Sequence, residues 1–176
     1  MRLKQRSSQI KSQDVLLLLK LLGSEKPESL RLVDLAMQLG ISQSEISHGL
    51  VRLQNAKLVD NQRTPQKANT FEFIAHGLKY IFPASLGPIK RGIPTAHSAP
   101  PLSVRIVAGT EPYVWATESG EVRGTSIEPL YLSAPEAAQK DRALYELLSL
   151  IDAVRVGRAR EQKMALDELR KRILNG

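Results

Sequence analysis

Besides Glu45, six polar side chains lie within eleven residues of the chain, beginning at Ser42 and continuing through QSEISHGLVR. They are Ser42, Gln43, Ser44, Ser47, His48 and Arg52. The polar face of an ordinary solvated helix carries Glu and Lys pairs, whereas most of these side chains are short and uncharged. In the DNA major groove Gln pairs with adenine, Arg with guanine and Ser with either. These residue types at helical spacing therefore predict contacts with the base edges of double-stranded DNA.

Two helices joined by a Gly-Ile-Ser turn are expected to position these side chains. Apolar spacing predicts one helix at 33–39, which Gly40 ends, and a second helix that Ser42 opens and that ends near Ala56. Glu45, three residues after Ser42, completes the pattern of a capping box. An earlier helix is predicted at 13–22, with Ser12 as its N-cap.

A two-stranded hairpin is predicted after the second helix of this pair. Residues 58–60 and 70–73 favour β-structure, and the polar residues between them include Pro65. No acidic residue occurs in 61–70, so Arg63 and Lys67 are candidates for contacts with phosphates or the minor groove. A short helix is predicted at 74–81.

The stretch LAMQLGISQSEISHGLVRLQNAKLV, residues 35–59, resembles the recognition unit of bacterial winged helix-turn-helix regulators of the MarR type. The matching positions are Leu35, Ala36, Leu39, Gly40, Ile41, Ser42, Ser44, Ile46, Ser47, Leu50, Leu53, Leu58 and Val59. His48 stands where the family has Arg, and Lys57 stands where it has Gly. The resemblance covers about residues 12–82 and implies a winged DNA-binding domain whose second helix enters the major groove.

The charge distribution agrees with a polyanion partner. The net charge is +7; residues 1–100 contain 14 Lys/Arg and 7 Asp/Glu, and residues 101–176 contain 11 of each. The whole excess therefore lies in the half with the candidate DNA contacts. Lys4, Arg6 and Lys11 are considered as an additional basic arm, with a disordered basic start as the alternative.

The rest of the chain is predicted to be a proline-rich connector at 83–112 and a C-terminal lobe at 113–176. Six of the ten prolines fall in 82–112, where LSVRIV is a possible strand. YVWAT and EVRGTSI are expected to form a hairpin around 118–120. A helix from near Pro135 carries an apolar stripe, and a last helix at 158–174 carries a second stripe. The expected fold class is α+β: an N-terminal winged helix-turn-helix, a small β-hairpin and a C-terminal helical lobe.

Several classes of function and site are disfavoured. No apolar run approaches the roughly 18 residues of a membrane span, no signal peptide is recognised, and cysteine is absent, so we expect a cytoplasmic protein without disulfides. The three His residues lack metal-ligand spacing and no phosphate-binding loop occurs, so no catalytic residue, metal or cofactor is expected. The loop KRGIPTAHSAPP is interpreted as a connector, with a ligand site as the alternative, and Trp115 as a core residue.

The sequence thus predicts a sequence-specific double-stranded DNA-binding transcriptional regulator, a repressor that acts as a homodimer. The dimer is expected to form through the stripe Leu144, Leu147, Leu148, Ile151 and Val154 and the second stripe Leu166, Leu169 and Ile173, which could instead cover each other within one chain. The alternative is a protein-interaction adaptor, or an antitoxin-like member of a two-protein operon, whose C-terminal lobe binds a protein partner.

Overall fold

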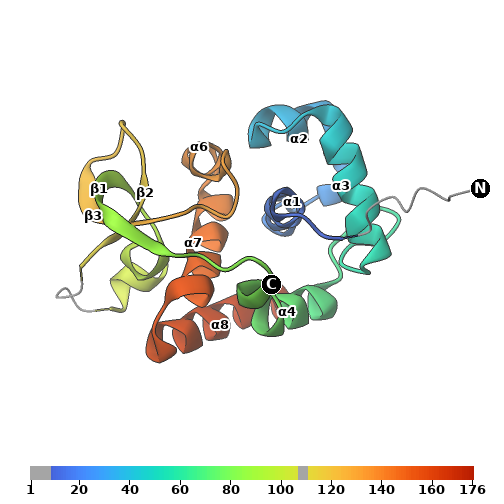
Figure 1. The fold of residues 1–176 in the computed structure, drawn as a ribbon. Coiled ribbons are helices and arrows are strands. Elements are labelled where there is room, and N and C mark those ends of the chain that lie inside the picture. The colour runs from blue at the N-terminus through green and yellow to red at the C-terminus, as the bar shows by residue number, and fades with distance from the viewer. Residues whose placement is uncertain (1–8, 107–110) are drawn as a thin grey trace, which may run out of the picture.

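The computed structural model describes residues 9–106 and 111–176, and this part of the chain folds as an α+β protein of eight α-helices and a small three-stranded sheet (Figure 1). Helices α2 and α3 lie at one end of the molecule, the strands lie at the opposite end, and α1 and α7 lie between them. Lys4 and Arg6 of the expected basic arm lie outside the described residues. None of the described helices is both long and apolar enough to cross a membrane.

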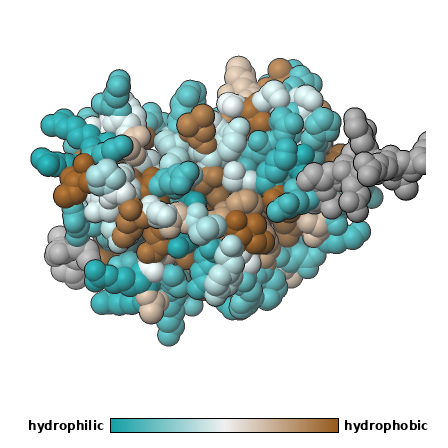
Figure 2. Space-filling view, viewed as in Figure 1, coloured by the Kyte–Doolittle hydropathy of each residue, from teal (hydrophilic) through white to brown (hydrophobic). Residues whose placement is uncertain are grey.

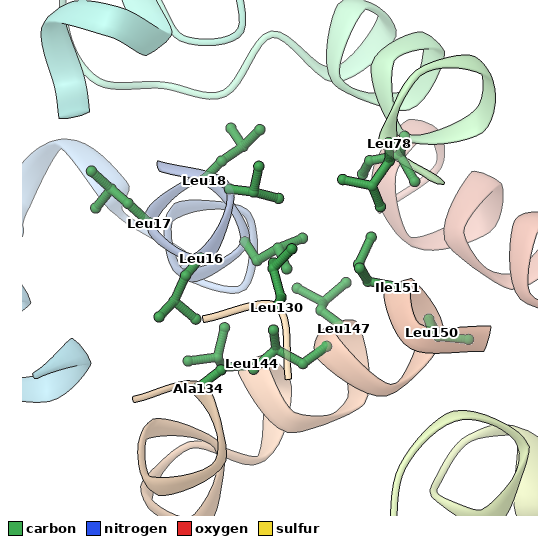
Figure 3. Close-up of a cluster of buried hydrophobic side chains, with 14 of the residues drawn as sticks. Leu16, Leu17, Leu18, Leu78, Leu130, Ala134, Leu144, Leu147, Leu150 and Ile151 are labelled. Carbon is green, nitrogen blue, oxygen red and sulfur yellow. The ribbon is translucent and has the colours of Figure 1, made fainter. Parts of the chain in front are cut away.

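Helix α1 (Ser12–Leu22) is the centre of the hydrophobic core. Residues 15–19 are each at most 1% exposed, which means that neighbours surround the helix on every side. It packs against α3 (Gln43–Asn55) and α7 (Arg142–Val156). Figure 3 shows part of the resulting cluster, in which Leu16 of α1 points toward Leu144 of α7 while Leu17 points away from α7. The N-terminal and C-terminal segments therefore share one core.

The two helices that were expected to present the polar side chains are confirmed. Helix α2 (Leu32–Leu39) ends at Gly40, whose φ of 62° places it in the left-handed region that favours glycine. Ser42 is the N-cap of α3, because its side-chain oxygen accepts a hydrogen bond from the Glu45 backbone N–H at 3.2 Å. Helix α1 also has the expected extent, although its N-cap is Lys11 rather than Ser12.

The expected hairpin at 58–73 is wrong. A single bridge between Val59 and Pro65 closes a compact turn, and the Asp60 carboxylate accepts the backbone N–H groups of Gln62 and Thr64 inside it. The chain then enters α4 (Lys67–His76). The turn is short because Asp60 satisfies the backbone donors that a longer loop would leave to solvent.

Residues 70–73 are helical although they favour strands, because their burial follows a helical period. Thr70, Phe71, Ile74 and Leu78 are buried. Helix α4 packs on α8 (Ala159–Leu174), and the Arg170 guanidinium lies 4.6 Å from the centre of the Phe71 ring. The short helix α5 (Leu78–Ile81) follows, so the expected helix at 74–81 is divided at Gly77.

The proline-rich segment is not an irregular connector, because it contains the strand β1 (Leu86–Pro94). Pro94 is the last residue of the strand, and Pro88 lies where the register shifts between Leu86 and Ile89, so neither position interrupts a regular ladder. The possible strand LSVRIV is also wrong. Leu102–Val104 form a 3₁₀ turn, η3, like Pro27–Ser29 (η1) and Ala96–Ser98 (η2), and Val107 lies outside the described residues.

The last two strands exist but do not form the expected hairpin. Strand β2 (Tyr113–Ala116) and strand β3 (Val122–Ile127) each pair antiparallel with β1, and they pair parallel with each other, Tyr113 opposite Thr125. The three strands close on themselves. Gly92 makes this possible, because a Cβ there would lie 2.0 Å from the Trp115 carbonyl oxygen.

Three helices complete the chain. The helix expected from Pro135 is split into α6 (Ala134–Lys140) and α7 at Asp141, whose carboxylate caps α7 by accepting the Leu144 N–H at 3.1 Å. Gly157 separates α7 from α8, as expected. The whole α7 stripe and Leu169 and Ile173 of α8 are buried within one chain, against α1, α6 and each other. The stripes therefore cover each other, as the intrachain alternative expected.

Candidate nucleic-acid interface

Five of the predicted contact residues lie together on the solvent side of the first half of α3. Ser42, Gln43, Ser44, Ser47 and His48 are all exposed. Val51 and Asn55 continue this side toward the end of the helix and are also exposed. The buried side of the same helix consists of Ile46, Gly49, Leu50 and Leu53 with Arg52. We name the five exposed residues 42, 43, 44, 47 and 48 the α3 surface.

Arg52 does not belong to the α3 surface, and the expectation that it faces DNA is wrong. It is only 8% exposed, and its guanidinium donates to both oxygens of Asp14 on α1, from Nε at 2.7 Å and from Nη2 at 2.8 Å. Asp14 is 1% exposed, so this is a buried bidentate ion pair. The hydrogen bonds to Asp14 raise the pKa of Arg52. The sequence could not indicate this role, because Asp14 lies on another helix.

The two helices approach closely where this ion pair lies. A Cβ on Gly49 would lie 2.8 Å from Asp14 Oδ1, so a larger residue would displace the carboxylate. The other Asp14 oxygen accepts the Lys11 backbone N–H at 2.8 Å. Asp14 thus joins the start of α1 to the middle of α3. This contact fixes the position of α3, and with it the α3 surface, relative to α1.

Glu45, the acidic residue in the first turn of α3, is turned toward α1. It is half-buried, accepts a hydrogen bond from Gln13, and lies 3.6 Å from Lys11 Nζ and 3.5 Å from Arg52 Nη2. The Gln13 hydrogen bond, aided by the nearby cations, lowers the pKa of Glu45 against the opposing effect of burial. His48 Nδ1 lies 3.8 Å from the other Glu45 oxygen. Because cations surround Glu45, its charge is compensated beside the α3 surface.

Arg63 and Lys67 do not extend from a hairpin tip as expected. Arg63 is half-buried in the turn with a φ of 68°, and its Nη1 donates to the Leu30 carbonyl at 2.9 Å. Lys67 is exposed at the start of α4, where its Nζ donates to the Gly176 carbonyl. Both cations serve contacts within the chain.

Lys57 has the backbone conformation of the glycine that the MarR-type pattern has at this position. Its φ is 60°, in the left-handed region, and its side chain is exposed. The turn after α3 therefore keeps a glycine-like conformation with a cation on it.

We compared the chain with protein-family models, with curated proteins and with solved structures. None of them matches. Any functional assignment therefore depends on the residues of the chain and their geometry.

A second polar cluster holds the strands to α7. Asp152 is 1% exposed, accepts hydrogen bonds from Thr95 at 2.9 Å and Trp115 at 2.6 Å, and pairs with Arg155 at 2.8 Å. Burial raises the pKa of Asp152, while Arg155 and the two donors oppose that shift. Arg155 also donates to the Phe82 carbonyl at 2.8 Å. These contacts are structural, and Trp115 is a core residue as expected.

Proposed function

We propose that this chain is a sequence-specific double-stranded DNA-binding transcriptional regulator that contacts the major groove with the α3 surface. The observation that carries the proposal is the composition of that surface: five exposed hydrogen-bonding residues and no carboxylate. The only acidic residue of α3, Glu45, is engaged with Gln13, Lys11 and Arg52. A phosphate backbone would therefore meet little repulsion at this surface.

The side chains of the α3 surface suit the chemistry of the groove. Gln43 has the donor and acceptor needed for a bidentate contact with adenine, and Ser44 and Ser47 can donate to or accept from any base. They lie in the first half of the helix, which is the half that helix-turn-helix proteins place against base edges. The backbone N–H groups at the start of α3 favour a phosphate.

The resemblance to MarR-type regulators supports the same proposal, with a narrower set of contacts than the sequence predicted. The side chains of Arg52 and Arg63 form hydrogen bonds within the chain, so these two residues are no longer candidates for DNA contacts. His48 takes the position of the family's Arg, and its exposed imidazole can donate to a phosphate or a base.

We propose further that the regulator is a dimer, because one α3 surface contacts few base pairs and a two-fold copy would double them. The repressor role stays a prediction from the sequence. The interface is not the α7 stripe, which is buried within one chain. The alternative function, a protein-interaction adaptor, is favoured by large apolar side chains that are strongly exposed, such as Tyr80 and Leu132.

Anisotropy titrations of the full chain with a labelled random-sequence duplex, at about 50 and about 200 mM salt, test the proposal. Wild type should bind at low salt and weaken steeply as salt rises. Gln43→Ala should lose affinity for a preferred duplex, whereas Gln139→Ala, an exposed glutamine of α6, should not. A chain without DNA affinity at low salt would contradict the proposal and favour the adaptor.

A further inference from the structure

Strands β1 and β3 form an antiparallel ribbon, and the first residues of β1 in this ribbon are open to solvent. All residues of 85–91 are exposed, so this part of β1 is uncovered on both faces. Strand β2 pairs with β1 only from Gly92 to Pro94. Figure 2 shows hydrophilic side chains, with a few hydrophobic ones among them, at the end of the molecule where Figure 1 places the strands.

Two arginines oppose each other across this ribbon. Arg91 and Arg123 are register partners, so their side chains leave the same face with Cβ atoms about 4.5–5.5 Å apart. Like charges placed directly opposite destabilise a strand pair. Both residues are exposed, and neither forms an ion pair with any acidic residue of the described chain. The segments outside the description, 1–8 and 107–110, contain no acidic residue.

The neighbouring charges do not compensate this pair. Lys90, next to Arg91, is exposed, and it too forms no ion pair within the described residues. Glu118 and Glu121, on the loop between β2 and β3, are exposed and form no ion pair with the two arginines. Arg91 and Arg123 thus oppose each other on one face without an ion pair, and Lys90 adds a cation on the other face of the strand, so this part of the fold presents surfaces suited to an anion.

The ribbon holds these cations on a fixed backbone. Gly124 lies opposite Lys90, and a Cβ there would lie 2.3 Å from the Pro112 carbonyl oxygen. Gly120 approaches the backbone of Gly92 equally closely. Such close backbone approaches leave the strands little freedom to move, so the arginines stand on a preorganised support.

We propose that the β1–β3 ribbon is a second surface for duplex DNA, separate from the α3 surface, in which Arg91 and Arg123 contact phosphates. Strands about 4.8 Å apart make a ribbon that enters a major groove about 12 Å wide. The next cross-strand pair on the same face is Ile89 and Thr125, and an apolar side chain or a Thr methyl packs on the thymine methyl group.

The two surfaces lie at opposite ends of the molecule (Figure 1), so they contact different duplex segments. An acidic protein is the other class of partner for such cations. The exposed residues 86–91 of β1, with Arg123 of β3 beside them, form a narrow edge that suits a groove better than the flat surface of a protein.

The test is an anisotropy titration with a labelled random duplex of roughly two helical turns over the salt range used for the proposed function. The variants are Arg91→Ala/Arg123→Ala and the control Arg158→Ala/Arg160→Ala, which removes the same charge from exposed residues at the start of α8. Each is also combined with the α3 variant Gln43→Ala/Ser47→Ala/His48→Ala. Circular dichroism verifies that every variant is folded.

The ribbon variant should lower affinity about tenfold, and its log-log salt slope should be shallower by about 1.8, or about 0.9 for each lost phosphate contact. The α3 variant should retain a salt-dependent affinity that disappears when the ribbon substitutions are added. The control should match wild type.

If the ribbon variant binds as wild type does, or if the control loses as much affinity, the ribbon is not a DNA surface. If the DNA affinity of the ribbon variant is unchanged, an acidic protein is the partner that the two arginines suit. These results are independent of whether the α3 variant changes base preference.

Discussion

At the scale of single residues, the contact between Arg52 and Asp14 decides how α3 is held. Two short hydrogen bonds inside the core join the first helix to the third, and Gly49 provides the space for the carboxylate. The proposed DNA contacts of the α3 surface depend on this support, because a groove-binding helix must present its side chains at a fixed angle.

Arg52→Ala is therefore expected to affect stability first. It leaves Asp14 buried without a partner, and the free energy of unfolding should fall by about 3–5 kcal/mol. Urea denaturation measures the change. Replacing both partners, Arg52→Met with Asp14→Leu, should recover much of the loss, because no buried charge is then uncompensated.

Arg31→Ala is the matched control for Arg52→Ala, since it removes the exposed pair Arg31–Asp34 and should leave the unfolding midpoint nearly unchanged. An Arg52→Ala protein as stable as wild type would mean that the ion pair contributes nothing to holding α3.

The sequence indicated local contacts of α3 and missed distant ones. The Ser42 cap was predictable, because Glu45 lies only three residues away. The pairing of Arg52 was not, because Asp14 lies 38 residues earlier and Arg52 has the same helical position in either role. A buried arginine and a base-contacting arginine look alike until the neighbouring helix is known.

At the scale of elements, helices with one apolar face were predictable and elements defined by tertiary contacts were not. α2 and α3 follow their apolar periods and caps, and α1 follows its long apolar run, although it is buried on every side and its N-cap is Lys11. The first part of α4 was missed, because Thr70 and Phe71 favour strands locally and become helical through packing on α8. β1 was missed because its prolines, at a register shift and at the strand end, resemble those of a loop.

Lys20 of α1 forms an ion pair with Asp141, the N-cap of α7, and this pair predicts that the stability of the fold depends on pH. Burial would raise the pKa of Asp141, but the Lys20 ammonium at 2.6 Å and the Leu144 N–H outweigh it, so that its pKa is lowered. A lowered folded-state pKa adds stability above the unfolded value of about 3.9, and this stability is lost as pH falls through the folded value.

Lys20→Met should therefore lower the free energy of unfolding by about 1–2 kcal/mol at pH 7, and should reduce its further loss below about pH 4. Urea midpoints from neutral to acid pH measure both effects. Lys140→Met, which removes the exposed pair with Glu136, is the control and should leave the pH profile unchanged. A Lys20→Met profile parallel to that of wild type would exclude Lys20 as the cause.

At the scale of the whole molecule, one core joins the two halves of the chain. α1 packs against both α3 and α7, and Figure 3 shows leucines of α1 and α7 in one cluster. The α+β class was predictable from the alternation of helical and strand-like segments. The parallel pairing of β2 and β3 was not, because the short connection between them is typical of a hairpin.

Deleting residues 136–176 should unfold the protein. The deletion removes α7, α8 and most of α6, and it exposes Leu16 and Leu78, which pack against α7. Thermal melts followed by circular dichroism should show no cooperative transition, whereas the full chain should melt cooperatively. A truncated chain that melts cooperatively would show that residues 1–135 fold without the C-terminal helices.

The most direct test of the central claim is enrichment of bound duplexes from a random-sequence pool by the full chain and by Gln43→Ala/Ser47→Ala/His48→Ala. These three residues are exposed, so the variant should remain folded, as circular dichroism verifies. Wild type should enrich one base pattern, and each lost base contact should cost about 1–3 kcal/mol of discrimination. The variant should therefore enrich no pattern or a different one. If it enriches the wild-type pattern with equal strength, the α3 surface does not determine base preference.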